Sequence, residues 1–205
     1  MDYTDEAILL MRRQMEQNEK ERHSEKVIQE ELEQSIYDED VKIFHIPVKF
    51  EEMELLDGKI TMRLPSDFTP RTKEEIARVY FLGPGPQHVY SNAYLDFALA
   101  LNWTDHQVPE ESLFDAAKGI KYVMERVGPK MKMMGEEKLK RPEGDLIFYK
   151  MLTNALDGVM YMNMFCASVE GRLLLGTISF DQKLSKRLAP LTEEIVKSLR
   201  VIKEE

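Results

Sequence analysis

The chain has 205 residues, of which 43% are hydrophobic and 32% are charged, and its formal net charge at pH 7 is −9. These fractions are normal for a globular protein, and the length allows one domain of ordinary size with an appendage. No run approaches the roughly 18 to 20 apolar residues of a membrane span, so we expect no spanning helix.

Cysteine usage and the first residues bear on the compartment. The single cysteine, Cys166, excludes an internal disulfide framework and favours a reducing compartment. It lies in an apolar run, and we expect it to be a small buried hydrophobe. The first residues are acidic and lack the basic start and apolar core of a secretory signal. We therefore expect a cytoplasmic protein.

The net charge is unevenly distributed along the chain. Residues 1–40 contain 13 acidic and 5 basic side chains, a net of −8, whereas residues 41–205 contain 24 and 23, a net of −1. Nucleic-acid binding needs a basic surface that displaces counterions from phosphate, so this partition argues against it. The modest basic cluster of Lys138, Lys140 and Arg141 is predicted to lie in a solvated loop.

Residues 1–40 form an acidic arm that lacks Gly and Pro and is rich in helix-forming side chains. We predict one helix or two from about Thr4 to Tyr37. The arm either packs on its own domain at one end or serves as a partner-binding helix, through which a homo-oligomer could form. Apolar residues recur at helical spacing near both ends and are absent from 16 to 26: Ile8, Met11 and Met15, then Ile28, Leu32 and Ile36.

The first elements of the globular domain, residues 41–205, are predicted to be strands. Apolar and polar residues alternate from 44 to 50, where Pro47 indicates an edge strand or a lead-in. They alternate again on both sides of Asp57 and Gly58, which predicts a hairpin with a two-residue turn. Thr72 and Glu75 form a capping box, so we expect a short helix over 73–79.

The rest of the chain predicts strands grouped around two longer helices. After a loop at 83–86, strands are expected over 88–91 and 94–102, and a helix starts near Pro109 and ends at Gly128. Strands over 146–153, 159–168 and 173–180 should form an antiparallel meander, and a last helix should start near Pro190. Without a regular βαβ alternation, the predicted class is α+β, a largely antiparallel sheet flanked by helices.

Several short segments, together with this order of elements, resemble one known group of folds. The chain is similar to the PsbP-like α/β/α sandwich group, which includes a Ran-binding import factor, DcrB-type bacterial proteins and chaperones of secreted effectors. The resemblance covers residues 41–202 and leaves the arm outside. It implies a binding protein without a shared active site. The segments are 64–68 (Leu-Pro-Ser-Asp-Phe), Asn92, 157–164, 171–175, Ser179 with Phe180, and Ser198 with Leu199.

Signatures of catalysis are missing from the sequence, and we expect no enzyme, no cofactor and no metal site. Asp105 and His106, beside Trp103 in a predicted loop, could act as a general base with its orienting partner. This leaves a small-molecule pocket or an enzyme near Trp103, His106 and His88 as the alternative function. In the simpler interpretation, Asp105 caps the helix that starts near Pro109. The carboxylates of Glu51, Glu52, Glu54 and Asp57 should be split between the two faces of a strand.

Methionine is unusually frequent, with 13 residues in the chain. Met160, Met162 and Met164 share one face of a predicted strand, and three more methionines cluster at 131, 133 and 134. Methionine lines surfaces that accept varied apolar partners, but it also fills gaps in cores. Tyr161 and Phe165 on the opposite face indicate a central strand that is covered on both sides. The leading hypothesis is a cytoplasmic protein-binding or adaptor domain, chaperone-like, that uses this face or the arm.

Overall fold

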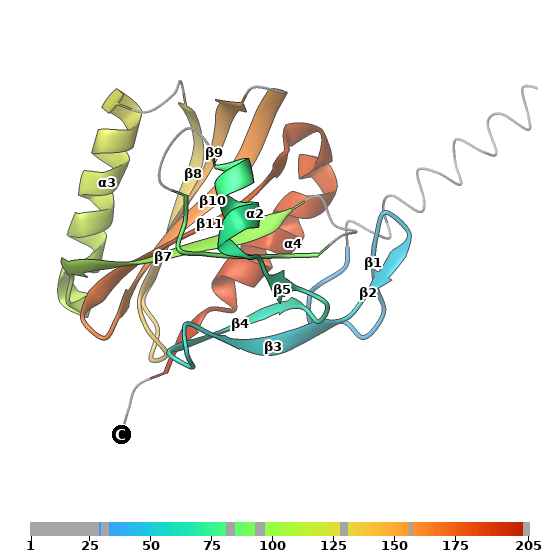
Figure 1. Cartoon of the computed structure of the whole chain (residues 1–205), viewed down its shortest axis with the longest axis horizontal. Helices are drawn as coiled ribbons and strands as arrows, with labels where there is room; N and C mark the ends of the chain where they lie inside the picture. The colour runs from blue at the N-terminus through green and yellow to red at the C-terminus, as the bar shows by residue number, and fades with distance from the viewer. Residues whose placement is uncertain are drawn as a thin grey trace, which may run out of the picture.

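The computed structural model describes residue 29 and residues 33–80, 85–92, 97–127, 131–155 and 158–202. It consists of a large twisted sheet with helices on both faces and two small sheets on one side (Figure 1). The elements are β1 (Val41–Ile43), β2 (Ile46–Val48), β3 (Phe50–Leu55), β4 (Ile60–Pro65), β5 (Thr69–Pro70), α2 (Lys73–Val79), β6 (His88–Ser91), β7 (Ala98–Gln107), α3 (Leu113–Val127), β8 (Met131–Leu139), β9 (Leu146–Ala155), β10 (Gly158–Val169), β11 (Arg172–Asp181), α4 (Ser185–Lys197) and β12 (Arg200–Val201).

The large sheet has seven strands in the order β5-β6-β7-β11-β10-β9-β8, and all its pairs are antiparallel. The predicted meander of β9, β10 and β11 forms its centre. Strands β3, β4 and β12 make a second sheet, and β1 and β2 make a third. The predicted α+β class and the α/β/α layers are therefore confirmed.

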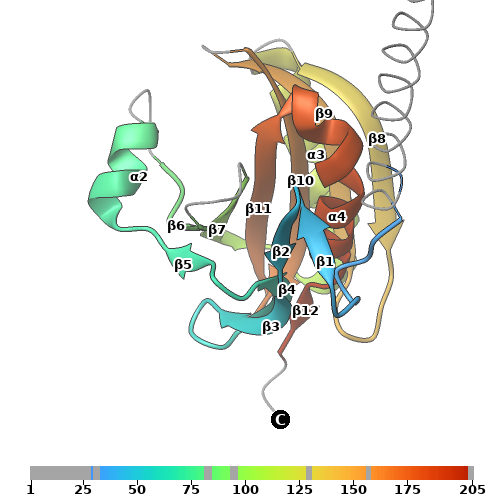
Figure 2. The ribbon, with the colours of Figure 1, turned by 90° about the vertical axis from the view of Figure 1, so that its right-hand side faces the viewer.

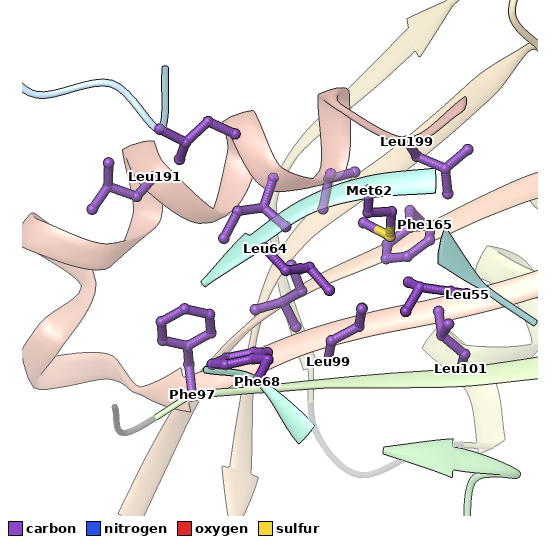
Figure 3. Close-up of a cluster of buried hydrophobic side chains, with 14 of the residues drawn as sticks. Leu55, Met62, Leu64, Phe68, Phe97, Leu99, Leu101, Phe165, Leu191 and Leu199 are labelled. Carbon is purple, nitrogen blue, oxygen red and sulfur yellow. The ribbon is translucent and has the colours of Figure 1, made fainter. Parts of the chain in front are cut away.

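Strand β10 separates the two cores, because its side chains alternate between the faces of the sheet. Tyr161 and Phe165 pack under α4 with the small sheets, while Met164 and Cys166 pack under α3. In the first core, side chains from β4, β7, β10 and α4 point toward one another (Figure 3). This core also encloses the rings of Phe68 and Phe97, whose centroids are 5.2 Å apart.

Helix α2 lies on the same face of the sheet as α3. Ile76 of α2 packs on Val89 and Ala100. Ala100 is the cross-strand partner of Thr177. Thr177 is also the cross-strand partner of Met164, which lies under α3. Direct cross-strand partners share a face. Figure 2 shows α2 standing apart, above β6 and β7, so the two helices cover opposite ends of one sheet face.

The capping box predicts α2 with its correct bounds. The Thr72 hydroxyl accepts from the Glu75 backbone N–H, and the Glu75 carboxylate accepts from the Thr72 N–H at 2.8 Å. These hydrogen bonds lower the pKa of the Glu75 carboxyl below its usual value. A local pattern of two residues thus determines where this helix begins.

Two predictions near the start of the domain differ from the structure, the turn at Asp57 and the single strand over 44–50. The hairpin at Asp57 has a four-residue turn, because Leu55 pairs with Ile60 and Leu56, Asp57 and Gly58 all have positive φ. Leu56 is buried, so this turn packs on the core through its first residue. The alternation over 44–50 is split into a separate β1–β2 hairpin, since residues 44 and 45 turn back at positive φ.

Three further predictions are corrected, two by strand pairing and one by burial of a helix face. Strand β7 extends to Gln107, so Trp103, Asp105 and His106 lie on a strand and not in a loop. Strand β8 pairs with β9 where no strand is predicted. Helix α4 starts at Ser185 and contains Pro190 in its interior. Burial of Leu188, Leu191 and Ile195 offsets the hydrogen bond that the proline removes.

The predicted solvated loop at 138–141 is also wrong. Lys138 lies on β8, and the half-buried guanidinium of Arg141 donates to the carbonyls of Lys197 at 2.6 Å, Leu199 at 2.9 Å and Gly144 at 3.2 Å. Burial lowers the pKa of this guanidinium below its usual value. Arg141 therefore satisfies carbonyls at and beyond the end of α4, which the helix itself leaves unpaired.

A buried polar pair holds α4 over β10. The Asn163 Nδ2 donates to Thr192 Oγ1 at 2.9 Å, and this hydroxyl lies 2.8 Å from the Leu188 carbonyl. Asn163 Oδ1 has no hydrogen-bond partner among the described residues. Since an unpaired buried oxygen costs stability, the pair restricts α4 to the alignment that keeps the remaining bonds.

Cys166 is buried as predicted, and burial raises the pKa of its thiol to about 12. We expect iodoacetamide to alkylate it only through unfolding, about a thousandfold slower than in denatured protein. Mass spectrometry against denaturant concentration measures this rate. Because the folded pKa is the higher one, the thiol's contribution to stability is present below pH 9 and is lost as the pH rises toward 12. Rapid alkylation in native buffer would contradict the burial.

Candidate partner-binding surface

Methionines from three adjacent strands line up across the sheet face under α3. Met133, Met151 and Met162 are successive cross-strand partners, and one step further toward the strand ends Met131 and Met160 both oppose Thr153. We call these five methionines the methionine face. Met124 of α3 belongs to the same apolar cluster as four of them, Met131, Met133, Met151 and Met162.

The methionines of β10 change from buried to partly exposed along the strand. Met164 is 4% exposed and belongs to the core, whereas Met162 and Met160 are partly exposed. Met131 and Met133 on β8 are also partly exposed. Of the three β10 methionines in the hypothesis, the structure thus places Met164 inside the core and the other two at its open end.

The sheet face between α2 and α3 is partly uncovered. Strand β11 lies between the strands that carry the two helices, and its side chains Thr177 and Ser179 on this face are partly exposed. On the α2 side, a pocket of about 370 Å³ has apolar lining from Ile76, Val79, Val89 and Ala98 and charged lining from Arg71, Glu75 and Arg78. Apolar surface thus adjoins the methionine face across one strand.

The root of the arm is fixed to α4. Ile36 is completely buried, and the Glu194 carboxylate accepts from the Ile36 N–H and the Ser35 hydroxyl, both at 2.8 Å. Arg63 donates from Nε to the Ile36 carbonyl at 2.8 Å. The expectation that one end of the arm packs on its own domain is met at this end.

The predicted extent of the arm helix needs correction at its end. Residues 33–40 contain turns and bends and no helix, although Gln29 is helical. Ile8, Met11 and Met15 lie outside the described residues, as do Ile28 and Leu32. Partner binding or self-association through these residues therefore stays a prediction.

The alternative site near Trp103 is not assembled as a catalytic dyad. Asp105 is bound to Arg172 at 2.6 Å, and His106, its neighbour on a strand, points to the opposite face. His106 and His88 are both exposed. The four pockets described for this structure, at 37–63, 46–92, 73–87 and 71–98, are lined by other residues than these histidines, Trp103 and Asp105.

Trp103 instead has cations on its ring and a hydrogen bond to a neighbouring strand. The Arg172 guanidinium lies 3.9 Å from the centre of its ring, and Lys59, which pairs with Glu170, lies 5.1 Å from it. The indole Nε1 donates to the Val169 carbonyl at 3.2 Å. These contacts join β7, β10 and β11 and give Trp103 a structural role. Asp105 does not cap the helix at Pro109, which has no side-chain cap.

The described residues contain no group of three or more His, Cys, Asp or Glu side chains that could hold a metal ion. Within the same ranges, no helix is long and apolar enough to cross a bilayer. Glu51, Glu52 and Glu54 are all exposed on β3.

The comparison with protein-family models and that with curated proteins found no match. Among solved structures, cyanobacterial PsbP (CyanoP) from Synechocystis sp. PCC 6803 is similar, with a TM-score of 0.56 and 14% identity over 75% of this chain and 92% of its own. The Ran-binding protein Mog1p of Saccharomyces cerevisiae has a TM-score of 0.43 and 15% identity, and the match covers 76% of this chain and 97% of Mog1p. LpqN of Mycobacterium tuberculosis, involved in cell envelope biogenesis, has a TM-score of 0.45 and 10% identity, and the match covers 76% of this chain and 92% of LpqN.

The likeness to CyanoP confirms the predicted PsbP-like fold. At 14% identity it shows the fold alone. Function must therefore be argued from the surface of this chain. The methionines of β10 and the cluster at 131–134 were visible in the sequence, but Met151 was missed, although it shares a face with Tyr149 in a predicted strand. The register that joins all three strands is visible only in the structure.

Proposed function

We propose that this domain is an adaptor or chaperone-like protein that binds another protein through the methionine face. The observation that carries the proposal is the row of methionines across three strands, which becomes partly exposed at Met160 and Met162. Unbranched, polarizable side chains can repack around different apolar groups. Such a surface suits an apolar segment of a partner better than a ligand that needs fixed polar contacts.

Two further features support this proposal. Beyond β11 the same side of the sheet reaches the pocket at α2, whose apolar side chains offer further contacts to an elongated segment. The root of the acidic arm is fixed on α4, on the opposite side of the sheet, so contacts made through the arm would be separate from the methionine face. The unpaired, buried Cys166 fits a reducing compartment, and we place the function in the cytoplasm. The proposal includes no catalytic step.

Replacing Met160 with glutamate tests the proposal. The side chain is partly exposed near a strand end, so the charge can reach solvent and the fold should persist. It would nevertheless place a carboxylate on the proposed contact, and we expect recovery of the bound partner from a host lysate to fall about tenfold. Quantitative mass spectrometry after capture on the tagged full-length chain measures the loss.

Met134→Glu is the matched control, because Met134 is 52% exposed on β8 and lies outside the methionine face. It should retain the partner at the native level. Equal thermal unfolding of both variants would exclude a general loss of fold. Unchanged recovery with Met160→Glu, or no partner above background with the native chain, would rule out the proposed contact.

A further inference from the structure

Strand β3 has an open hydrogen-bonding edge. It is the last strand in the order β12-β4-β3, and its six residues pair with β4 without any shift in register. On its other side no backbone hydrogen bond to a described residue is present. Every second residue of such an edge therefore directs its N–H and C=O outward, ready to pair with another strand. Figure 1 shows β3 at the lower border of the molecule.

The other edge strands of these two sheets, β5, β8 and β12, are protected against pairing with another strand. Strand β5 has two residues, one of them Pro70, and β12 also has two. Strand β8 is longer, but its register shifts between Met133 and Gly135, and its charges pair with the helices through Glu136 to Lys121 and Glu137 to Lys197. Short strands, proline, bulges and charges are devices that prevent edge pairing. Among the described edges, β3 is the long and regular one.

The open edge carries negative charge. Glu51, Glu52 and Glu54 are exposed, and only Glu51 has a cationic partner among the ion pairs of the described residues, the neighbouring Lys49. Arg63 lies opposite Glu52 in the register, but its Nε donates to the Ile36 carbonyl. The carboxylates of Glu52 and Glu54 are therefore available to a positively charged strand laid beside β3.

A pocket of about 590 Å³ meets the first residue of β3, Phe50, and contains the exposed ring of Tyr37. Its apolar lining comes from Val41, Val48 and Phe50. Its charged lining is Asp38, Glu39 and Asp40 with Lys42, Lys49 and Arg63. Of these cations, Lys49 is paired with Glu51, and Arg63 lies against Tyr37 at 5.2 Å. The pocket can hold one long side chain with its charged end among carboxylates.

We propose that β3 binds an extended basic peptide segment of another protein by β-strand addition, with a lysine or arginine side chain in the pocket beside Tyr37. Backbone hydrogen bonds along the edge supply the contact, and Glu52 and Glu54 select positive side chains. This site is separate from the methionine face and does not depend on it.

A second copy of the chain does not fit the same edge. Antiparallel pairing of two β3 strands would bring the carboxylates of Glu51, Glu52 and Glu54 close to those of the other copy, and like charges across strands are unfavourable. The same carboxylates thus disfavour self-pairing and favour a basic strand. The charge of the edge selects the partner.

A short labelled peptide that alternates lysine with threonine and valine serves as the probe for the full-length chain. Fluorescence anisotropy measures its binding. The same peptide with N-methyl groups at every second residue keeps its charge but cannot complete the ladder, and we expect about tenfold weaker binding. The Glu52→Gln, Glu54→Gln double variant should weaken the unmodified peptide about fivefold, and Tyr37→Ala should weaken it as well.

The matched control is Glu111→Gln with Glu125→Gln, two exposed carboxylates near α3, and it should bind the peptide like the native chain. The Met160→Glu variant should also bind the peptide like the native chain, so the proposals for the methionine face and for this edge are tested independently. No binding of the unmodified peptide, equal binding of the N-methylated one, or equal loss in the Glu111 and Glu125 control would each overturn the proposal.

Discussion

Replacing Gly176 with alanine is expected to lower the free energy of unfolding by about 3 kcal/mol, the upper part of the range for overpacked cores. Gly176 is the direct cross-strand partner of Phe165, whose ring lies over it. A Cβ at this position would lie 2.0 Å from Cζ and 2.4 Å from Cε2 of the ring. Phe165 is completely buried, so its ring cannot move without disturbing the core under α4.

Denaturant unfolding followed by the fluorescence of Trp103, the single tryptophan, measures this loss. Gly119→Ala is the control of opposite sign, because Gly119 lies in α3 with open space around it, and alanine should stabilise the helix by about 0.5 to 1 kcal/mol. In a Phe165→Leu background, Gly176→Ala should cost much less. An unchanged midpoint for Gly176→Ala would show that the ring does not occupy this position.

Replacing Arg141 with methionine is expected to lower the free energy of unfolding by about 3 kcal/mol, because two carbonyls at and beyond the end of α4 lose a charged donor. The guanidinium reaches Lys197 and Leu199 from a loop more than fifty residues away in sequence. Its Nε also donates to Gly144 within that loop. The change therefore releases both the end of α4 and the connection between β8 and β9.

Two variants separate the geometry of Arg141 from its charge. Arg141→Lys keeps the charge but cannot reach all three carbonyls at once, so we expect it to recover less than half of the loss. Lys140→Met, at an exposed neighbouring position, should change stability by less than about 0.5 kcal/mol. Chemical unfolding of the three variants measures this order. Full recovery with lysine would mean that charge alone matters here.

The accuracy of the sequence predictions depended on whether the deciding contact is local. The capping box of Thr72 and Glu75 involves residues three apart, and it predicted α2 with both of its bounds. The alternation of β10 likewise predicted that Tyr161 and Met164 face opposite layers. Strand β8 escaped prediction because an edge strand with Lys and Glu at exposed positions shows no apolar alternation. It is a strand because β9 pairs with it.

In the candidate site, too, the sequence predicted the features that depend on local spacing and missed those that depend on distant contacts. The sequence indicated Met160, Met162 and Met164 as one face but not how deeply each is buried, because burial depends on where α3 ends above the strands. It also grouped Trp103, Asp105 and His106 as a candidate pocket. Arg172, about seventy residues later, binds Asp105 and lies against the Trp103 ring, and no local pattern reports such a partner.

The sequence by itself determined the α+β class, the central meander, the acidic charge of the arm and the two-sided burial of β10. All of these depend on composition, on residue periodicity and on turns within a few residues. The tertiary structure alone decided the open edge of β3, the register of the methionine face and the anchoring of Ile36 on α4. Each of these depends on which distant segments pack together, because a strand edge or a side chain is exposed only where no other part of the chain covers it.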